Sequence, residues 1–168
     1  SFVSRGLGDV YKRQIYKDKA LVNWDTKFKT AISDLEVVPT DVSTQIYYIK
    51  YPSSNSESIT VATVRPETIF GDVAIAVNPN DSRYTSLKKE TFTIPLTSRS
   101  IPLIFDEYSD PEMGSGAVKI TPAHDFNDFE IGKRHNLELL NILNMDGSLN
   151  ENCPKEFQGL DRFEARKK

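Results

Sequence analysis

The middle of the chain alternates short runs of β-branched and aromatic residues with polar, turn-forming segments. The runs "TQIYYIKY" and "SITVATVR" enclose "PSSNSE", whose Pro, Ser and Asn are typical of a loop, so this region predicts a β-hairpin. Further strands are predicted in "DVAIAV", "TFTIPLTSRSIPLIFDEY" and "GSGAVKIT". Pro95 and Pro102 restrict the second of these stretches to sheet edges or bends, because proline lacks the N–H that a sheet ladder uses. In "LLNILNMDGSLNE", Asp146-Gly147 between apolar runs predicts one more hairpin.

One helix is predicted, after Pro122. The segment "HDFNDFEIGKRHNL" has acidic residues at its start and basic residues near its end, which complements a helix dipole. Phe126, Phe129 and Leu137 supply apolar side chains that can pack on the rest of the domain. Earlier in the chain, residues 15–38 have short apolar groups without a helical stripe and predict short strands or an extended connector. Many strands and one good helix predict an α+β, mostly β fold, with a closed barrel as one form of its core.

The composition favours a soluble domain. The chain has 168 residues, of which 38% are hydrophobic, and no apolar run is long enough to span a membrane. A formal charge of −3 argues against a broad basic surface, so nucleic-acid binding would need a local patch or other domains. The single Cys153 and two histidines leave little material for a disulfide or a metal site, which suggests a reducing compartment. The first 14 residues lack the apolar region of a signal peptide.

Two predicted strands end with a hydroxyl and a cation on the same face. Side chains at i and i+2 of a strand point to the same face. Thr63 and Arg65 therefore share one face of the first strand, and Lys119 and Thr121 share one face of the second. Pro66 ends the first strand, because proline keeps the preceding residue extended and itself opens a turn or helix. We therefore expect these two strand ends to present polar groups to a shared cavity.

The start of the predicted helix adds two acids. Asp125 and Asp128 are spaced i and i+3, which places both carboxylates on one side of the first helical turn. Like charges at this spacing repel, and a bound cation such as the α-ammonium of an amino acid would relieve the repulsion. The pair therefore predicts a site for a small ammonium-bearing ligand, close to the ends of the two strands.

Each of these residues also has a structural explanation. Asp125 can cap the helix and Asp128 can suit its positive end. Arg65 can form a surface ion pair with Glu67, and the threonines can reflect β propensity or hydroxyl bonds in turns. Lys119 interrupts the apolar run "AVKIT", so its ammonium needs a partner unless that face is solvated.

Other polar features are predicted to be structural. His124 and His135 have neither metal-ligand spacing nor a nucleophile motif beside them. The glycines of "GSG" at residues 114–116 lack the spacing of a nucleotide fingerprint and predict a bulge or close backbone packing. The basic run "KRH" at residues 133–135 suits the C-terminal end of the helix dipole.

Several long motifs agree, in order, with a known family. "TVRPETIFGDVAIAVNPND" and "GSGAVKITPAHDFNDFEIGKRH" resemble the editing domain inserted in valyl-tRNA synthetases, and "LVNWD" and "QGLDRFEARK" resemble the segments that flank it. The leucyl and isoleucyl relatives have the same domain, but "GAVKITPAHDFND" is the valyl form. The resemblance divides the chain into four parts: a leader unlike the family (residues 1–14), a connector from the catalytic domain (15–40), the editing domain (41–150) and a return connector (151–168).

The resemblance also implies a site and an activity. It implies a β-barrel-like core with peripheral helices. It also implies a deacylation pocket that acts in the cytoplasm without cofactor or metal. This pocket hydrolyses threonine esterified to the 3′ end of tRNA(Val), with threonyl-adenylate as a further candidate substrate. The rest of the synthetase is the other implied partner, because the HIGH-type and KMSKS-type activation motifs are absent from the sequence. The implied catalytic residues are Lys119, Asp125 and Asp128. The implied substrate-binding residues are Thr63, Arg65, Thr68, Met113 and Thr121.

Two alternatives to threonine editing stay open at this point. An isolated module could bind the aminoacyl-tRNA 3′ end without turnover, which the acidic net charge favours for this segment alone. An editing domain of leucyl or isoleucyl type could act on another small amino acid. Met113 bears on the second alternative, because many family members carry Phe there and a thioether makes a softer pocket wall.

Overall fold

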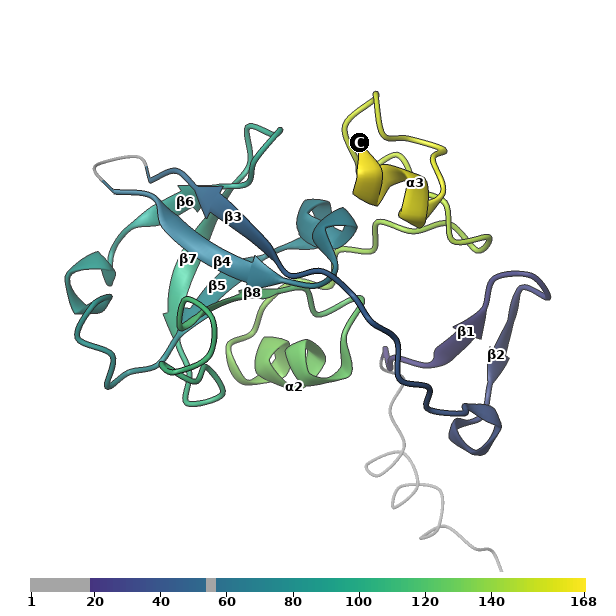
Figure 1. Cartoon of the computed structure of the whole chain (residues 1–168), viewed down its shortest axis with the longest axis horizontal. Helices are drawn as coiled ribbons and strands as arrows, with labels where there is room; N and C mark the ends of the chain where they lie inside the picture. The colour runs from purple at the N-terminus through teal and green to yellow at the C-terminus, as the bar shows by residue number, and fades with distance from the viewer. Residues whose placement is uncertain (1–18, 54–56) are drawn as a thin grey trace, which may run out of the picture.

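The computed structural model of the chain describes residues 19–53 and 57–168 (Figure 1). The predicted leader, residues 1–14, lies outside this part of the chain. The described strands are β1 Asn23–Asp25, β2 Thr30–Ile32, β3 Tyr47–Tyr51, β4 Ile59–Thr63, β5 Ala74–Val77, β6 Thr91–Thr93, β7 Ser100–Phe105 and β8 Ala117–Ile120. The described helices are α2 Phe126–Arg134 and α3 Arg162–Lys167, with short 3₁₀ turns η1 Asp34–Glu36, η2 Pro66–Gly71 and η3 Thr85–Leu87. None of these helices has the length and apolar content that crossing a bilayer requires.

The predicted hairpin in the first half of the chain is confirmed. Strands β3 and β4 pair antiparallel, with Tyr47 opposite Thr63 and Tyr51 opposite Ile59. Burial alternates along both strands, so that Tyr51 and Ile59 are buried while Lys50 faces solvent. This alternation is what the β-branched and aromatic runs predict, because successive side chains of a strand point to opposite faces.

A four-stranded sheet, in the order β6-β7-β5-β8, forms the other part of the β-structure beside the β3–β4 hairpin. Strand β5 lies parallel to β7 and antiparallel to β8, and all four of its residues are buried. Strand β4 lies against β8, which brings the hairpin onto this sheet. Within the described residues the hairpin and the sheet have separate ladders, joined by one isolated bridge between Ser53 and Phe92, so the barrel-like core is open rather than closed.

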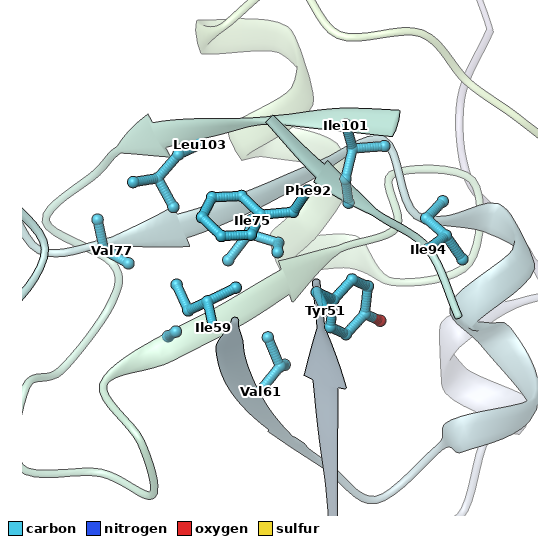
Figure 2. Packing of buried hydrophobic residues seen from close by; sticks show 10 residues of the cluster. Tyr51, Ile59, Val61, Ile75, Val77, Phe92, Ile94, Ile101 and Leu103 are labelled. Carbon is cyan, nitrogen blue, oxygen red and sulfur yellow. The ribbon is translucent and has the colours of Figure 1, made fainter. Parts of the chain in front are cut away.

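The main hydrophobic core lies between the hairpin and the sheet. Figure 2 shows side chains from both units pointing into this layer. The buried cluster consists of Tyr51, Ile59, Val61, Ile75, Val77, Phe92, Ile94, Ile101, Leu103 and Ala117. Because apolar side chains of both units lose their contact with water here, this layer holds the hairpin in place without a shared ladder of hydrogen bonds.

One strand position departs from the sequence prediction. Pro95 lies in the turn after β6, as expected, but Pro102 lies within β7, which is an internal strand and not an edge. Pro102 is opposite Thr91 of β6, whereas the pairing with β5 begins only at Leu103. The missing N–H is therefore tolerated where β7 passes from one neighbour to the other.

Helix α2 lies against β8 and is confirmed as the predicted helix. Phe129 is buried and Leu137 packs against the cluster that contains Ile120 and Ile131. Phe126 is 52% exposed, so the prediction that it packs is wrong. It is the first residue after the N-cap, and at this position its side chain faces solvent rather than the sheet.

The two ends of the described chain form short elements. Strands β1 and β2 form a small antiparallel hairpin, which agrees with the short strands predicted for this segment. Helix α3 lies against η2 (Figure 1). The predicted turn at Asp146-Gly147 is also present: Gly147 has a φ of +82°, and its N–H donates to the carbonyl of Asn144 at 3.0 Å. A Cβ at Gly147 would lie 2.9 Å from Thr26, so glycine is required there for two reasons.

Candidate functional site

A cavity of about 500 Å³ lies where β4 and β8 end and α2 begins. This volume is in the range of small-molecule sites. All eight residues that the sequence and the resemblance singled out line it: Thr63, Arg65, Thr68, Met113, Lys119, Thr121, Asp125 and Asp128. The structure thus brings these residues together around one space, while their roles in binding and catalysis stay predictions.

Asp128 is a buried carboxylate in the wall of the cavity. Its Oδ2 accepts a hydrogen bond from the backbone N–H of Thr121 at 2.8 Å, which ties the first turn of α2 to the end of β8. Burial raises the pKa of Asp128 to about 6, and the nearby charge of Asp125 acts in the same direction. The hydrogen bond from Thr121 and the charge of Lys119 oppose this rise. The cavity therefore contains a carboxyl group whose pKa is raised above its ordinary value.

Asp125 is the N-cap of α2, as the structural explanation predicted. Its Oδ1 accepts from the N–H groups of Asn127 at 2.9 Å and Asp128 at 3.2 Å. Such a cap satisfies N–H groups that have no partner within the helix. The cap also fixes the backbone that carries Asp128. The two acids therefore have different contacts: Asp125 caps the start of the helix, and Asp128 accepts a hydrogen bond from the end of the strand.

Lys119 has the partner that its place in an apolar strand requires. Its Nζ donates to Oδ1 of Asp72 at 2.9 Å and also to the hydroxyl of Thr121. The Lys119 side chain is only 8% exposed. Its charge is therefore compensated on the buried side of the cavity wall.

Asp72 is the residue that sequence reasoning missed. It is fully buried, and it accepts from the hydroxyls of Thr121 at 2.7 Å and Tyr51 at 2.6 Å in addition to Lys119. Complete burial raises the pKa of Asp72, while the charge of Lys119 and the three hydrogen bonds act to lower it. A signal was present: Asp72 directly precedes the apolar run "VAIAV", where an acid needs a cation as much as Lys119 needs an anion.

Arg65 is the more accessible cation of the site. Its Nη1 donates to the carbonyl of His124 at 3.0 Å, and its side chain is 39% exposed. The alternative ion pair with Glu67 is long, because Nε of Arg65 lies 4.0 Å from Oε1 of Glu67. Glu67 instead receives two hydrogen bonds from Arg166 of α3, at 2.7 and 2.9 Å. Arg65 thus keeps a charge that can act on a ligand.

The three threonines all make structural hydrogen bonds, as the structural explanation predicted. Thr63 Oγ1 accepts from the N–H of Arg65 at 3.1 Å, and the Thr68 hydroxyl donates to the carbonyl of Arg65 at 2.9 Å. The Thr121 hydroxyl donates to Asp72. Because Thr63 acts as an acceptor here, its own hydroxyl proton remains available for a ligand in the cavity.

The rim of the cavity is apolar. Met113 is 75% exposed at this rim, and Tyr48 and Tyr108 line the cavity as well. Gly114 has a φ of +59°, and a Cβ there would lie 2.9 Å from that of Ala62 in β4. The glycine therefore allows the loop that carries Met113 to approach the hairpin, which confirms the predicted close packing.

Both histidines have structural contacts. His124 Nε2 accepts from the N–H of Ile142 at 3.0 Å, and burial lowers its pKa to about 4, helped by the charges of Arg65 and Lys119. His135 Nε2 lies 2.8 Å from a carboxylate oxygen of Asp106, to which Arg134 also donates. Neutral His124 therefore adds no charge to the cavity near pH 7.

A pH series of unfolding experiments tests the environment of Asp128. Its folded-state pKa of about 6 lies above the ordinary value of an aspartate, 3.8, so the folded state binds the proton more tightly, and ionisation costs stability as the pH rises. We expect Asp128→Asn to gain stability relative to the parent chain between about pH 4 and pH 7, by up to roughly 3 kcal/mol. Urea unfolding at several pH values measures this difference. A difference that stays constant over the range would contradict the burial of an ionising group at this position.

Comparisons with known proteins identify relatives of this chain. The family model described as "Leucyl-tRNA synthetase, editing domain" matches residues 83–159. The valine–tRNA ligase of Pelagibacter ubique is 61% identical over 158 residues, which cover 94% of this chain and 18% of the relative. The valine–tRNA ligase of Francisella tularensis is 52% identical over 175 aligned residues, which cover 98% of this chain and 19% of the relative. The predicted preference for the valyl form is thereby confirmed.

A solved structure extends the likeness to the fold. The ternary complex of Agrobacterium radiobacter K84 agnB2 LeuRS with tRNA and LeuAMS matches 65% of this chain and 17% of that chain, with a TM-score of 0.50 at 18% identity. The predicted mostly β fold with peripheral helices agrees with this match. The chain spans about a fifth of the length of the curated relatives it matches. With identities above 50% over nearly all of its residues, the chain belongs to the valyl-tRNA synthetase family, as a homologue of the segment that carries the editing domain.

Proposed function

We propose that this segment hydrolyses the ester that joins threonine to the 3′-terminal adenosine of tRNA(Val), as the editing part of a valine–tRNA ligase. The observation that carries the proposal is the single cavity lined by all eight motif residues, which contains a carboxylate, a cation and several hydroxyls. As is known for valine-selecting synthetases, an apolar activation pocket rejects the nearly isosteric threonine only about 10²-fold. A second, polar pocket can supply the remaining discrimination.

Asp128 holds the α-ammonium of the aminoacyl group. Burial and the nearby negative charge of Asp125 both raise the pKa of Asp128. The ionised carboxylate is therefore stabilised by an additional positive charge. A ligand ammonium supplies the missing positive charge and favours the ionised form. Asp125 contributes indirectly, because its side chain caps the turn that presents Asp128.

Arg65 and Lys119 have different electrostatic roles. Arg65 is half-exposed at the cavity and stabilises negative charge on the nucleotide phosphate or on the oxyanion that forms during ester hydrolysis. Lys119 is paired with Asp72, so it supports the wall of the cavity and the position of Thr121 rather than carrying a free charge. This division follows from the partners of the two cations.

The hydroxyls of the wall select threonine over valine. Thr63 can donate a hydrogen bond to the threonyl hydroxyl, while Thr68 and Thr121 place further oxygens around the cavity. Valine would leave such groups without partners, and an unpaired buried polar group costs about 1–3 kcal/mol. Met113, at the exposed rim, contacts the outer part of the aminoacyl-adenosine.

Other parts of the ligase complete the reaction cycle in the cytoplasm. The formal charge of −3 on this segment provides little attraction for tRNA, so the remainder of the synthetase supplies most of the affinity and all of the activation chemistry. Threonyl-adenylate has the same ammonium and hydroxyl and is a second substrate of the same cavity.

The test is release of threonine from mischarged tRNA(Val) by a full-length valine–tRNA ligase that carries this segment. Asp128→Asn keeps an acceptor for the Thr121 N–H but removes the charge, and we expect it to slow release by about 10²-fold or more. Glu130→Gln is a matched control, because Glu130 is an exposed acid of the same helix.

Three outcomes separate the possibilities. Slow release by Asp128→Asn with normal release by Glu130→Gln supports the proposal. Equal rates for Asp128→Asn and the parent enzyme would remove Asp128 from the reaction. Binding of the charged 3′ end without any threonine release, even in single turnover at high enzyme concentration, would show a binding module instead of a deacylase.

A further inference from the structure

We propose that Asp72, which lies behind the cavity wall, is a positioning residue for this reaction: it fixes Lys119 and Thr121 and balances the positive charge that acts on Asp128. This inference rests on the proposed deacylase function. Asp72 is not part of the cavity lining, so it acts through its neighbours and not on the substrate.

The geometry around Asp72 is fully determined by hydrogen bonds. Oδ1 accepts from Lys119 Nζ at 2.9 Å and from the Thr121 hydroxyl at 2.7 Å, and Oδ2 accepts from the Tyr51 hydroxyl at 2.6 Å. Arg99 also donates to the backbone carbonyl of Asp72 at 2.9 Å. The carboxylate therefore links the hairpin residue Tyr51 to two cavity residues at the end of β8.

An apolar packing arrangement would serve stability at this position as well as an ion pair does. Removing two charges from water costs several kcal/mol per ion, and replacing a buried pair by apolar residues of similar volume is often neutral or stabilising. Asp72 is nevertheless completely buried with Lys119 as its partner. What the ion pair adds is a defined direction for the Lys119 ammonium and a balanced charge beside the cavity.

Several charged groups act on Asp128 from the elements around it. Asp125 lies on its own helix turn, Lys119 comes from β8, and Asp72 lies just before β5. Arg65 lines the same cavity from the end of β4. The negative charges of Asp125 and Asp72 disfavour ionisation of Asp128, whereas Lys119 favours it. Removing only the Asp72 charge leaves Lys119 uncompensated and shifts this balance in one direction.

The decisive experiment is the pH profile of threonine release by the full-length ligase. Asp72→Asn keeps the size and one acceptor but removes the charge, so Asp128 ionises more readily. We expect the acidic limb of the kcat/KM profile to move to lower pH by about one unit. We also expect release at neutral pH to slow by about tenfold, because Lys119 and Thr121 are less firmly held.

Two further variants separate positioning from stability. Tyr51→Phe removes one hydrogen bond to the same carboxylate but leaves its charge, so it is expected to lower stability without moving the acidic limb downward. The double variant Asp72→Asn/Lys119→Met removes both charges. We expect the acidic limb of its kcat/KM profile to return toward that of the parent enzyme, while threonine release stays slow. The double variant also remains informative if the single variant does not fold, because it leaves no unpaired buried charge.

The failure of this inference is distinguishable from failure of the proposed function. If the parent enzyme does not release threonine, the deacylase proposal fails. If the parent enzyme does release threonine and all variants share its acidic limb and rate, Asp72 has no positioning role. Valine charging at the separate activation site reports in each case that the enzyme is folded.

Discussion

Phe92→Ala is expected to lower the free energy of unfolding of the chain by about 3–5 kcal/mol, the usual cost of deleting a buried phenylalanine. Phe92 has no exposed surface and lies in the cluster between the hairpin and the sheet (Figure 2). Its ring comes from β6, the strand farthest from β8 in the sheet order. Because one isolated bridge, between Ser53 and Phe92, and not a ladder joins the hairpin to the sheet, the loss of the buried ring removes part of what holds them together.

Urea unfolding, followed by circular dichroism, measures this effect. Thr91→Ala is the matched control, since Thr91 lies next to Phe92 on the same strand but is exposed. We expect the control to change stability by less than about 0.5 kcal/mol. A loss below about 1 kcal/mol for Phe92→Ala would show that the hairpin is held by other contacts.

Arg166→Gln is expected to cost about 2–4 kcal/mol, because it leaves the Glu67 carboxylate buried without its main counter-charge. The Glu67 side chain is 2% exposed, and Arg166 donates to both of its oxygens at 2.7 and 2.9 Å. Arg65 lies at 4.0 Å from the same carboxylate and compensates only in part. The loss should shrink in the double variant Glu67→Gln/Arg166→Gln, in which no unpaired charge remains.

The same unfolding experiment provides the control for this pair. Lys167→Gln removes an exposed charge from the neighbouring position of α3 and should have little effect. Equal losses for Arg166→Gln and Lys167→Gln would show that helix charge, and not the contact with Glu67, is what matters. An additive double variant would likewise exclude coupling between the two residues.

Local patterns in the sequence were sufficient to predict most of the elements. Alternation of apolar and polar residues predicts the β3–β4 hairpin, and the acid-to-base gradient predicts α2, because both depend on neighbours within a few residues. The same reasoning failed for Pro102. An internal strand tolerates a proline there because the pairing of β7 with β5 begins only at the next residue, and local sequence does not determine that position. The openness of the barrel-like core also depends on distant pairings that no local pattern encodes.

The candidate site was predicted more completely than the contacts that support it. Side-chain direction in a strand places Lys119 and Thr121 together, and spacing on a helix places Asp125 and Asp128 together, so these pairs follow from local geometry. The partner of Lys119 is 47 residues away in the sequence, at Asp72. Sequence reasoning can state that such a partner is needed, but only the fold determines which acid provides it.

The bond between the Asp128 carboxylate and the backbone N–H of Thr121 has a mechanical consequence. It joins the beginning of a helix to the last residues of a strand, and both of these ends form walls of the cavity. If α2 slid along the sheet, the bond would break as the space widened. The position of α2 against the end of β8 therefore contributes to the width of this cavity.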